Sequence, residues 1–214
     1  MARRKKEPRA VHRQNIATAA EELFTKKGIE ATSMDEIAQK AGYSKATLYV
    51  YFQNKEEIVG LLVLESMKKL YDYIVGAIQE EKSMRERYLL ICQGLVRYQE
   101  KYPFYFQIVL KGINVNFEQE ECLPEEEETF RIGEELNLVL KKFVEEGIAA
   151  GEFRQEINSI STVFAFWGML SGLIQLAVNK EEYIKKAMNQ TKQEFLQNGF
   201  DTLYHTIAKE KQDE

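Results

Sequence analysis

Hydrophobic residues recur along most of this chain at the three- and four-residue spacing of an α-helix, and no stretch shows the convincing alternation of a strand. In the first such stretch, Ile16, Ala20 and Phe24 fall on one face. Gly28 follows as a C-terminal cap, because glycine readily adopts the left-handed conformation that ends many helices. The periodicity therefore predicts an all-α protein of about nine helices.

Capping signals divide the N-terminal part into three short helices and one long one. Ser33 and Glu36 have the spacing of a capping box, which opens a short helix that Gly42 ends. Ser44 is the natural cap of the third helix. Asn54 then begins a long fourth helix that we expect to reach about residue 80.

The same signals predict the remaining helices at about 83–101, from Pro103, from Pro124, at about 159–178 and at about 189–208. A polar connection is expected between the last two. No linker of flexible composition separates the N-terminal helices from the rest. We therefore expect the fourth helix to join an N-terminal three-helix domain, residues 9–69, to a C-terminal domain, residues 70–214.

Charge is distributed unevenly along the chain. The net charge of −5 conceals eleven Lys and Arg against six acidic residues in positions 1–55, while the remainder is strongly acidic. A basic N-terminal segment followed by an acidic remainder suits a protein that binds a polyanion through its N-terminal part. Charged runs are, however, usually solvated surface. The run Arg3-Arg4-Lys5-Lys6 is expected to add affinity for such a polyanion, with a solvated tail as the alternative.

The sequence offers little chemistry for catalysis. The stretch Gly168–Gly172 resembles a nucleophile elbow, but its spacing is wrong, no strand precedes it and no histidine lies nearby in sequence. Cys92 and Cys122 form no motif, and the two histidines lie at opposite ends of the chain. We expect neither an enzyme nor a bound metal or cofactor.

The most apolar segment is 163–178, which contains a serine and a glutamine. Its sixteen residues are fewer than the roughly 20 that a membrane span needs. The segment is therefore predicted to be a core or interface helix. With no hydrophobic leader visible, we expect a cytoplasmic protein without membrane contact.

The third helix, between Ser44 and Asn54, is the most informative element. It is too short to be stable alone, yet it presents Lys45, Thr47, Tyr49 and Tyr51 instead of a routine solvated face. Lysine and threonine can hydrogen-bond base edges, and tyrosine hydroxyls suit phosphates. These residues point to a helix-turn-helix that reads the DNA major groove.

The stretch from Ile16 to Ile58 resembles the DNA-binding domain of the tetracycline-repressor (TetR) family of bacterial regulators. The residues that carry the resemblance are Ala20, Leu23, Phe24, Gly28, Thr32, Ile37, Ala38, Ala41, Gly42, Ser44, Thr47, Leu48, Tyr49, Tyr51, Phe52, Lys55 and Glu56. One departure is Tyr43, where a smaller aliphatic residue is more usual after the turn glycine. Beyond about residue 69 only the general layout is similar.

The resemblance implies a homodimer whose first three helices bind operator DNA and whose C-terminal helices bind a small molecule. The predicted DNA-binding residues are Ser33, Ser44, Lys45, Ala46, Thr47, Tyr49, Tyr51 and Lys55. Of these, positions 45, 46, 47 and 49 would face the groove. Tyr51 and Lys55 would contact the DNA backbone, and Ser33 would anchor the second helix near a phosphate.

The last two long helices carry small residues at regular spacing. Gly168 and Gly172 lie four apart on one helix, and Phe195, Gly199 and Leu203 repeat that spacing on the other. Small residues let helices approach closely, and in the TetR family these two helices form the four-helix bundle of the dimer. Packing within one chain is the alternative.

Aromatic and soft residues of the central helices form the expected effector site. They are Tyr88, Cys92, Tyr102, Phe104, Phe106, Phe130, Phe164 and Trp167. Most aromatics at helical spacing belong to a core, so more than half of these are expected to be core residues. The shortage of charge among them predicts an apolar or amphipathic ligand.

Together these observations predict a ligand-responsive transcriptional regulator, a repressor that acts in the bacterial cytoplasm and on the nucleoid when bound. It would bind a palindromic operator as a homodimer, because one short helix contacts few base pairs. The alternative is a helix-turn-helix module that binds DNA or a protein partner without an effector.

Overall fold

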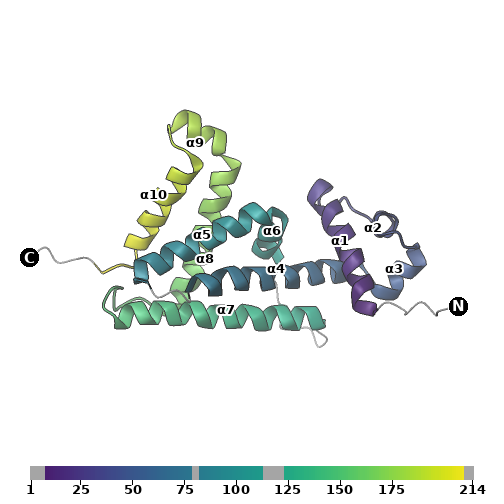
Figure 1. The fold of residues 1–214 in the computed structure, drawn as a ribbon, viewed down its shortest axis with the longest axis horizontal. Helices are drawn as coiled ribbons and strands as arrows, with labels where there is room; N and C mark the ends of the chain where they lie inside the picture. The colour runs from purple at the N-terminus through teal and green to yellow at the C-terminus, as the bar shows by residue number, and fades with distance from the viewer. Residues whose placement is uncertain (1–7, 79–81, 113–122, 210–214) are drawn as a thin grey trace, which may run out of the picture. The chain divides into compact units, whose positions relative to one another are not determined.

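The computed structural model describes residues 8–78, 82–112 and 123–209, and these form ten α-helices (Figure 1). They are α1 (Arg9–Lys27), α2 (Met34–Ala41), α3 (Lys45–Tyr51), α4 (Lys55–Ile78), α5 (Met84–Lys101), α6 (Pro103–Gly112), α7 (Pro124–Ala149), α8 (Ser159–Asn179), α9 (Glu181–Ala187) and α10 (Lys192–His205). The all-α prediction is confirmed. One antiparallel bridge, between Phe153 and Ala208, is the extent of β-pairing within the described ranges.

The additional helix is α9, which lies where a polar connection was expected. Its seven residues are mostly charged, and Ile184 is its buried residue. A helix of two turns with one buried position shows no hydrophobic periodicity, so the sequence pattern could not reveal it. Packing against α8 and α10 stabilises it instead.

The predicted caps are present at the helix starts. Ser33 accepts a hydrogen bond from the Glu36 amide while the Glu36 carboxylate accepts one from the Ser33 amide, and Ser83 forms the same capping box. Gly42 ends α2 with φ of +76°, in the left-handed region that glycine occupies without strain. Asn54 caps α4 by accepting from the Glu57 amide at 2.9 Å.

The chain divides into two compact units, and the boundaries fall inside α4, at the start of α6 and inside the first two turns of α7. The first unit contains Met1–Met67 with Phe104–Phe130, and the second contains Lys68–Pro103 with Arg131–Glu214. The first division lies near residue 69, and the domain boundary expected there stays a prediction. The grouping of α6 with the N-terminal helices is a feature that the sequence did not suggest.

Contacts from α6 explain why it belongs to the first unit. The ring of Phe104 lies 6.2 Å from that of Phe24 in α1, and the Tyr105 hydroxyl donates to Glu21 at 2.8 Å. Ser66 in α4 donates to the Tyr105 carbonyl at 3.0 Å in a buried setting. Apolar contacts and hydrogen bonds therefore hold α6 on both α1 and α4.

In the second unit, α8 and α10 run alongside each other and α9 joins them (Figure 1). Gly199 in α10 permits this approach, because a Cβ there would lie 2.5 Å from the Leu173 side chain of α8. Gly147 plays a similar part in α7, where a Cβ would lie 2.2 Å from the fully buried ring of Phe153. Both glycines are therefore explained by close packing within the chain.

Candidate nucleic-acid interface and ligand cavity

The third helix, α3, is anchored through one fully buried side chain. Leu48 is 0% exposed, and Phe52, which follows the helix, is 1% exposed. Ser44 caps the N-terminus by accepting from the Thr47 amide at 3.1 Å. A helix of seven residues is not stable in isolation, so these contacts with α1 and α2 hold it in place.

The C-terminal end of α3 is capped from another helix. Arg9 of α1 donates to the Val50 carbonyl at 3.1 Å, and Arg13 of α1 donates to the Tyr51 carbonyl at 3.1 Å. α3 has no basic residue in its own last turn. Cations at a helix C-terminus stabilise its unpaired carbonyls and the negative end of its dipole, so α1 supplies what α3 lacks.

The solvent-facing side of α3 includes residues that the sequence assigned to DNA, together with Val50, which is 63% exposed. Lys45 and Ala46 are exposed, and Tyr49 is 44% exposed. Thr47 is half-buried, with its hydroxyl 2.7 Å from that of Ser44. The helix thus presents a short polar surface around a methyl group and a phenol, which suits contact with base edges.

Lys45 forms an ion pair with Asp35 of α2, with its Nζ 2.8 Å from a carboxylate oxygen. Both side chains are about 60% exposed, and the hydrogen bond to Asp35 raises the pKa of Lys45 above its usual value. Water screens such a pair strongly. Lys45 can therefore exchange Asp35 for another acceptor at little cost.

Tyr51 is held in an aromatic cluster on the α1 side of α3. Its ring centroid lies 5.1 Å from that of His12 and 6.3 Å from that of Tyr43. The Tyr43 hydroxyl and His12 Nδ1 are 2.8 Å apart. Tyr43, the departure from the family pattern, thus orders the aromatic side chains beside α3.

Lys55 has a structural role that the sequence did not predict. Its ammonium donates to the Ile29 carbonyl at 2.8 Å and to the Thr32 carbonyl at 3.2 Å, and thereby ties the start of α4 to the turn between α1 and α2. An ammonium has three N–H donors, and these two bonds use two of them. Contact of the third N–H donor with a DNA phosphate stays a prediction.

Ser33 is engaged at the N-terminus of α2. Its hydroxyl donates to Glu36 at 2.9 Å, and Glu36 also pairs with Lys27 at 2.5 Å. The hydrogen bond from Lys27, followed by those from Ser33, lowers the pKa of Glu36 to about 2. A phosphate at this helix end would therefore share Ser33 with a carboxylate. The basic run Arg3-Arg4-Lys5-Lys6 lies outside the described residues.

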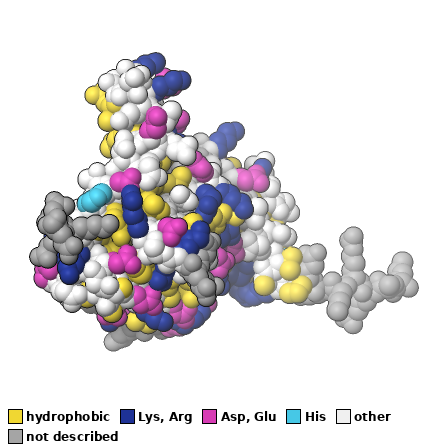
Figure 2. Space-filling model, turned by 60° about the vertical axis from the view of Figure 1, so that its left-hand side comes forward, with side chains coloured by type: hydrophobic (Ala, Val, Ile, Leu, Met, Phe, Trp, Pro, Cys, Tyr) yellow, Lys and Arg dark blue, Asp and Glu magenta, His cyan; other side chains and the backbone are white. Residues whose placement is uncertain are grey.

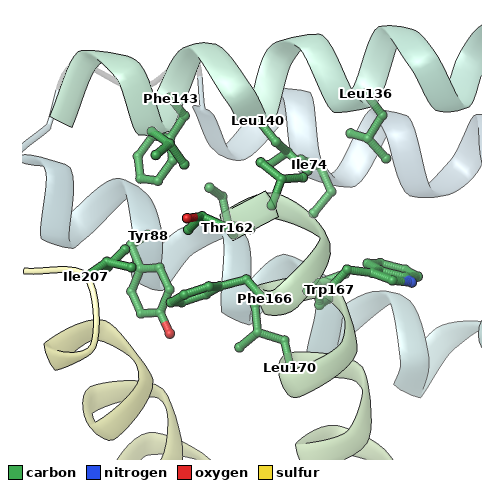
Figure 3. Close-up of a pocket in the computed structure, with 14 residues that line it drawn as sticks. Ile74, Tyr88, Leu136, Leu140, Phe143, Thr162, Phe166, Trp167, Leu170 and Ile207 are labelled. Carbon is green, nitrogen blue, oxygen red and sulfur yellow. The ribbon is translucent and has the colours of Figure 1, made fainter. Parts of the chain in front are cut away.

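The second unit contains an apolar cavity of about 70 Å³ (Figure 3). Helices α4, α5, α7 and α8 and the residue Ile207 enclose it. The lining residues are Ile74, Tyr88, Ile91, Leu95, Leu136, Leu140, Phe143, Val144, Thr162, Val163, Phe166, Trp167, Leu170 and Ile207. Such a volume holds a few water-sized groups, so a larger ligand requires some of these side chains to move.

Polar groups contribute little to the cavity wall. The Tyr88 hydroxyl donates to the Phe200 carbonyl at 3.0 Å, and Figure 3 shows the Tyr88 ring against that of Phe166, with centroids 5.9 Å apart. Burial raises the pKa of Tyr88, and it raises that of the nearby Cys92 to about 12. Both groups are therefore neutral at physiological pH.

Two of the eight residues expected at an effector site, Tyr88 and Trp167, line this cavity. The other six do not line it. Cys92 is fully buried, Tyr102 packs on Tyr73 and Tyr98, Phe164 is 59% exposed, and Phe104, Phe106 and Phe130 belong to the first unit. An effector role for these residues stays a prediction. Helical spacing does not show which face of a helix turns inward, and the aliphatic residues that form most of the wall carry no chemical signal.

One face of α8 is apolar and exposed. Ile160, Phe164, Gly168, Gly172 and Leu176, each four residues after the last, are all exposed. Within the part of the chain that the structure describes, both glycines have open space where a side chain would project. Hydrophobic side chains also reach the surface around the end formed by α8, α9 and α10 (Figure 2). An apolar stripe of this kind is a candidate interaction surface.

The other three residues predicted at a dimer interface lie on α10, where Phe195, Gly199 and Leu203 are half-buried. Gly199 is accounted for by Leu173, which fits the alternative of packing within one chain at that position. Among the described helices, α8 is also the one long and apolar enough to cross a membrane, with a mean hydropathy of 1.6. Its buried side packs on α5 and α10 within the unit.

These features define a helix-turn-helix protein with a separate helical body. Residues 16–62 match the model of the bacterial regulatory proteins of the tetR family. The HTH-type transcriptional regulator TtgR of Pseudomonas putida is 37% identical over 81 residues, which is 38% of each chain. The chain thus matches about two fifths of that relative's length.

Longer matches cover the helical body as well. The fatty acid metabolism regulator protein of Bacillus subtilis is 23% identical over 195 residues, 86% of this chain and 93% of that protein. The TetR family regulator PfmR of Thermus thermophilus is 26% identical with a TM-score of 0.66, over 89% of this chain and 97% of that one. The chain belongs to the TetR family of transcriptional regulators.

Two lysines of this site are expected to differ in their effect on stability. Replacing Lys55 by methionine removes hydrogen bonds to two carbonyls and should lower the free energy of unfolding by about 1–3 kcal/mol. Replacing the exposed Lys45 by methionine should leave it nearly unchanged. Chemical denaturation of both variants measures the difference, and equal stability would contradict the role given to Lys55.

Proposed function

We propose that this protein is a ligand-responsive transcriptional repressor that binds a palindromic operator as a homodimer. The observation that carries the proposal is α3, a seven-residue helix fixed at both ends that turns Lys45, Ala46 and Tyr49 to solvent. A helix with no role outside the fold would not need such external support. The protein would act in the cytoplasm by binding and not by catalysis, as its relatives are regulators.

The proposed DNA contacts follow the positions of the side chains on α3. Lys45, Ala46, Thr47 and Tyr49 would reach base edges, while Tyr51, Ser33 and the remaining donor of Lys55 would bind phosphates. Ser44 would act through its cap on the helix. Residues 9–69 form the proposed DNA-binding domain, and residues 70–214 the proposed effector-binding and dimerisation domain.

A duplex selected from a randomised library by the wild-type protein provides the test of base reading. Replacing Lys45 or Thr47 by alanine should weaken binding to that duplex by about 5- to 100-fold and relax the preference at one position of each half-site. Lys26→Ala, a change at an exposed lysine of α1, is the matched control. An unchanged sequence preference in the Lys45 variant would exclude base reading by that residue.

The homodimer is proposed to form through the exposed apolar stripe of α8. Burying such a stripe against a second copy removes Phe164, Leu176 and their neighbours from water. The open space above Gly168 and Gly172 would let two helices approach closely. Two copies would also present two recognition helices to a palindrome, with half-sites about one helical turn apart or slightly more.

Replacement of Gly172 by leucine tests the interface. The isolated chain has room for this side chain, so the variant should fold but associate poorly, and operator binding should fall with association. The control is Gly76→Leu, at another exposed helical glycine with open space around it. Light scattering at micromolar concentration measures the mass of each. A monomeric wild-type protein, or a dimeric Gly172 variant, would contradict the proposal.

The effector is proposed to be apolar or amphipathic and to bind in the cavity of the second unit. The wall is almost entirely hydrocarbon, and Tyr88, which lines it, and the buried Cys92 are both neutral. A charged group placed there would lose its hydration without a partner. To release DNA, the ligand must bind the form with the lower DNA affinity more tightly, a shift that α4 would transmit.

Trp167, the single tryptophan, lines the cavity and provides a probe of binding. We expect 1-decanol to change its fluorescence, to raise the melting temperature and to release the operator, whereas sugars and amino acids should do none of these. Replacing Leu140 by lysine should abolish the response. Release by polar metabolites alone would contradict an apolar site, and no release by any compound would favour the effector-independent module.

A further inference from the structure

Arg13 makes three contacts that join α3, the proposed recognition helix, to α7. Its Nη1 donates to the Tyr51 carbonyl at 3.1 Å, and its Nη2 lies 2.5 Å from a carboxylate oxygen of Glu125. The guanidinium also lies over the Phe52 ring, 4.3 Å from the centroid. All of these residues belong to the first unit, so one side chain of α1 connects the end of α3 with the first turn of α7.

The setting of this ion pair makes it stronger than an ordinary surface pair. The side chains of Arg13 and Glu125 are 20% and 21% exposed, so water screens them less than it screens Lys45 and Asp35. The planar guanidinium fits a carboxylate, a carbonyl and an aromatic face at once, which a lysine could not do. Removing either partner would leave a half-buried charge without its counter-ion.

The first turn of α7 holds Glu125 in position. The Leu123 amide donates to the Glu126 carboxylate at 3.0 Å, and Thr129 donates to the Glu125 carbonyl at 2.7 Å. Pro124 begins the helix, where its fixed φ is favourable. Glu126 thus serves the helix terminus, while the Glu125 side chain turns to Arg13.

We propose that Glu125, acting through Arg13, is a positioning residue for the recognition helix. Glu125 fixes the guanidinium, and the guanidinium fixes the Tyr51 carbonyl and hence the exit of α3. This inference rests on the proposed function, because the orientation of α3 matters for binding only if α3 enters DNA. A carboxylate of the C-terminal acidic sequence then supports DNA binding that its charge alone would oppose.

The direction in which one substitution changes the DNA affinity distinguishes this role from a purely electrostatic effect. Removing a negative charge near a DNA-binding surface should strengthen binding to the polyanion. Loss of the positioning contact should weaken it. We expect Glu125→Gln to bind the selected duplex about three- to tenfold more weakly than wild type at one salt concentration, measured by fluorescence anisotropy.

Glu127→Gln is the matched control, since it removes an equal charge from the same turn of α7 without an ion pair to Arg13. It should bind as wild type does or slightly more tightly. In an Arg13→Gln background, Glu125→Gln should cause no further loss. Equal or tighter binding by the Glu125 variant, or the same loss in both backgrounds, would overturn the proposal.

A measurement without DNA distinguishes this inference from the proposed function. Amide hydrogen exchange of residues 48–52 should be faster in Glu125→Gln than in wild type, and unchanged in Glu127→Gln. Equal exchange in the two variants would overturn the positioning role. Failure of the wild-type protein to bind any duplex would instead contradict the proposed function.

Discussion

The helix α3, which is proposed to enter the DNA groove, is too short to hold its own conformation, and other residues of the first unit stabilise it. Leu48 anchors it in the core, Ser44 caps its start, and Arg9 and Arg13 cap its end from α1. Because so little of this support is local, Lys45, Ala46, Tyr49 and Val50 of this helix stay exposed to solvent. A helix this short depends on contacts from other elements for its stability.

The small core of the first three helices explains why α6 and the start of α7 join the first unit. Three helices of this size bury a small core, and Phe104 and Tyr105 of α6 extend it. Glu125 adds an ionic contact at the opposite end of α1 from Phe24. α7 also supplies Leu136, Leu140, Phe143 and Val144 to the cavity wall, so one continuous helix contributes to both units.

The two units differ in what their polar groups do. In the first, Arg9 and Arg13 cap the end of α3, and the ion-paired Lys45 remains close to solvent. In the second, the cavity is lined by hydrocarbon, and the buried Tyr88 and Cys92 are kept neutral. The proposed surface for a polyanion and the proposed cavity for an apolar ligand would require these opposite arrangements of polar groups.

The amino-acid sequence by itself determined the helical class, the caps at Ser33, Ser44, Asn54 and Ser83, and the identity of the helix-turn-helix, because these depend on spacing and on contacts three or four residues apart. Only the tertiary structure decided which side of each central helix faces the cavity. It also decided that Lys55 binds carbonyls 23 and 26 residues away and that Arg13 meets Glu125 across 112 positions. Such partners are chosen by packing, which leaves no periodic trace in the sequence.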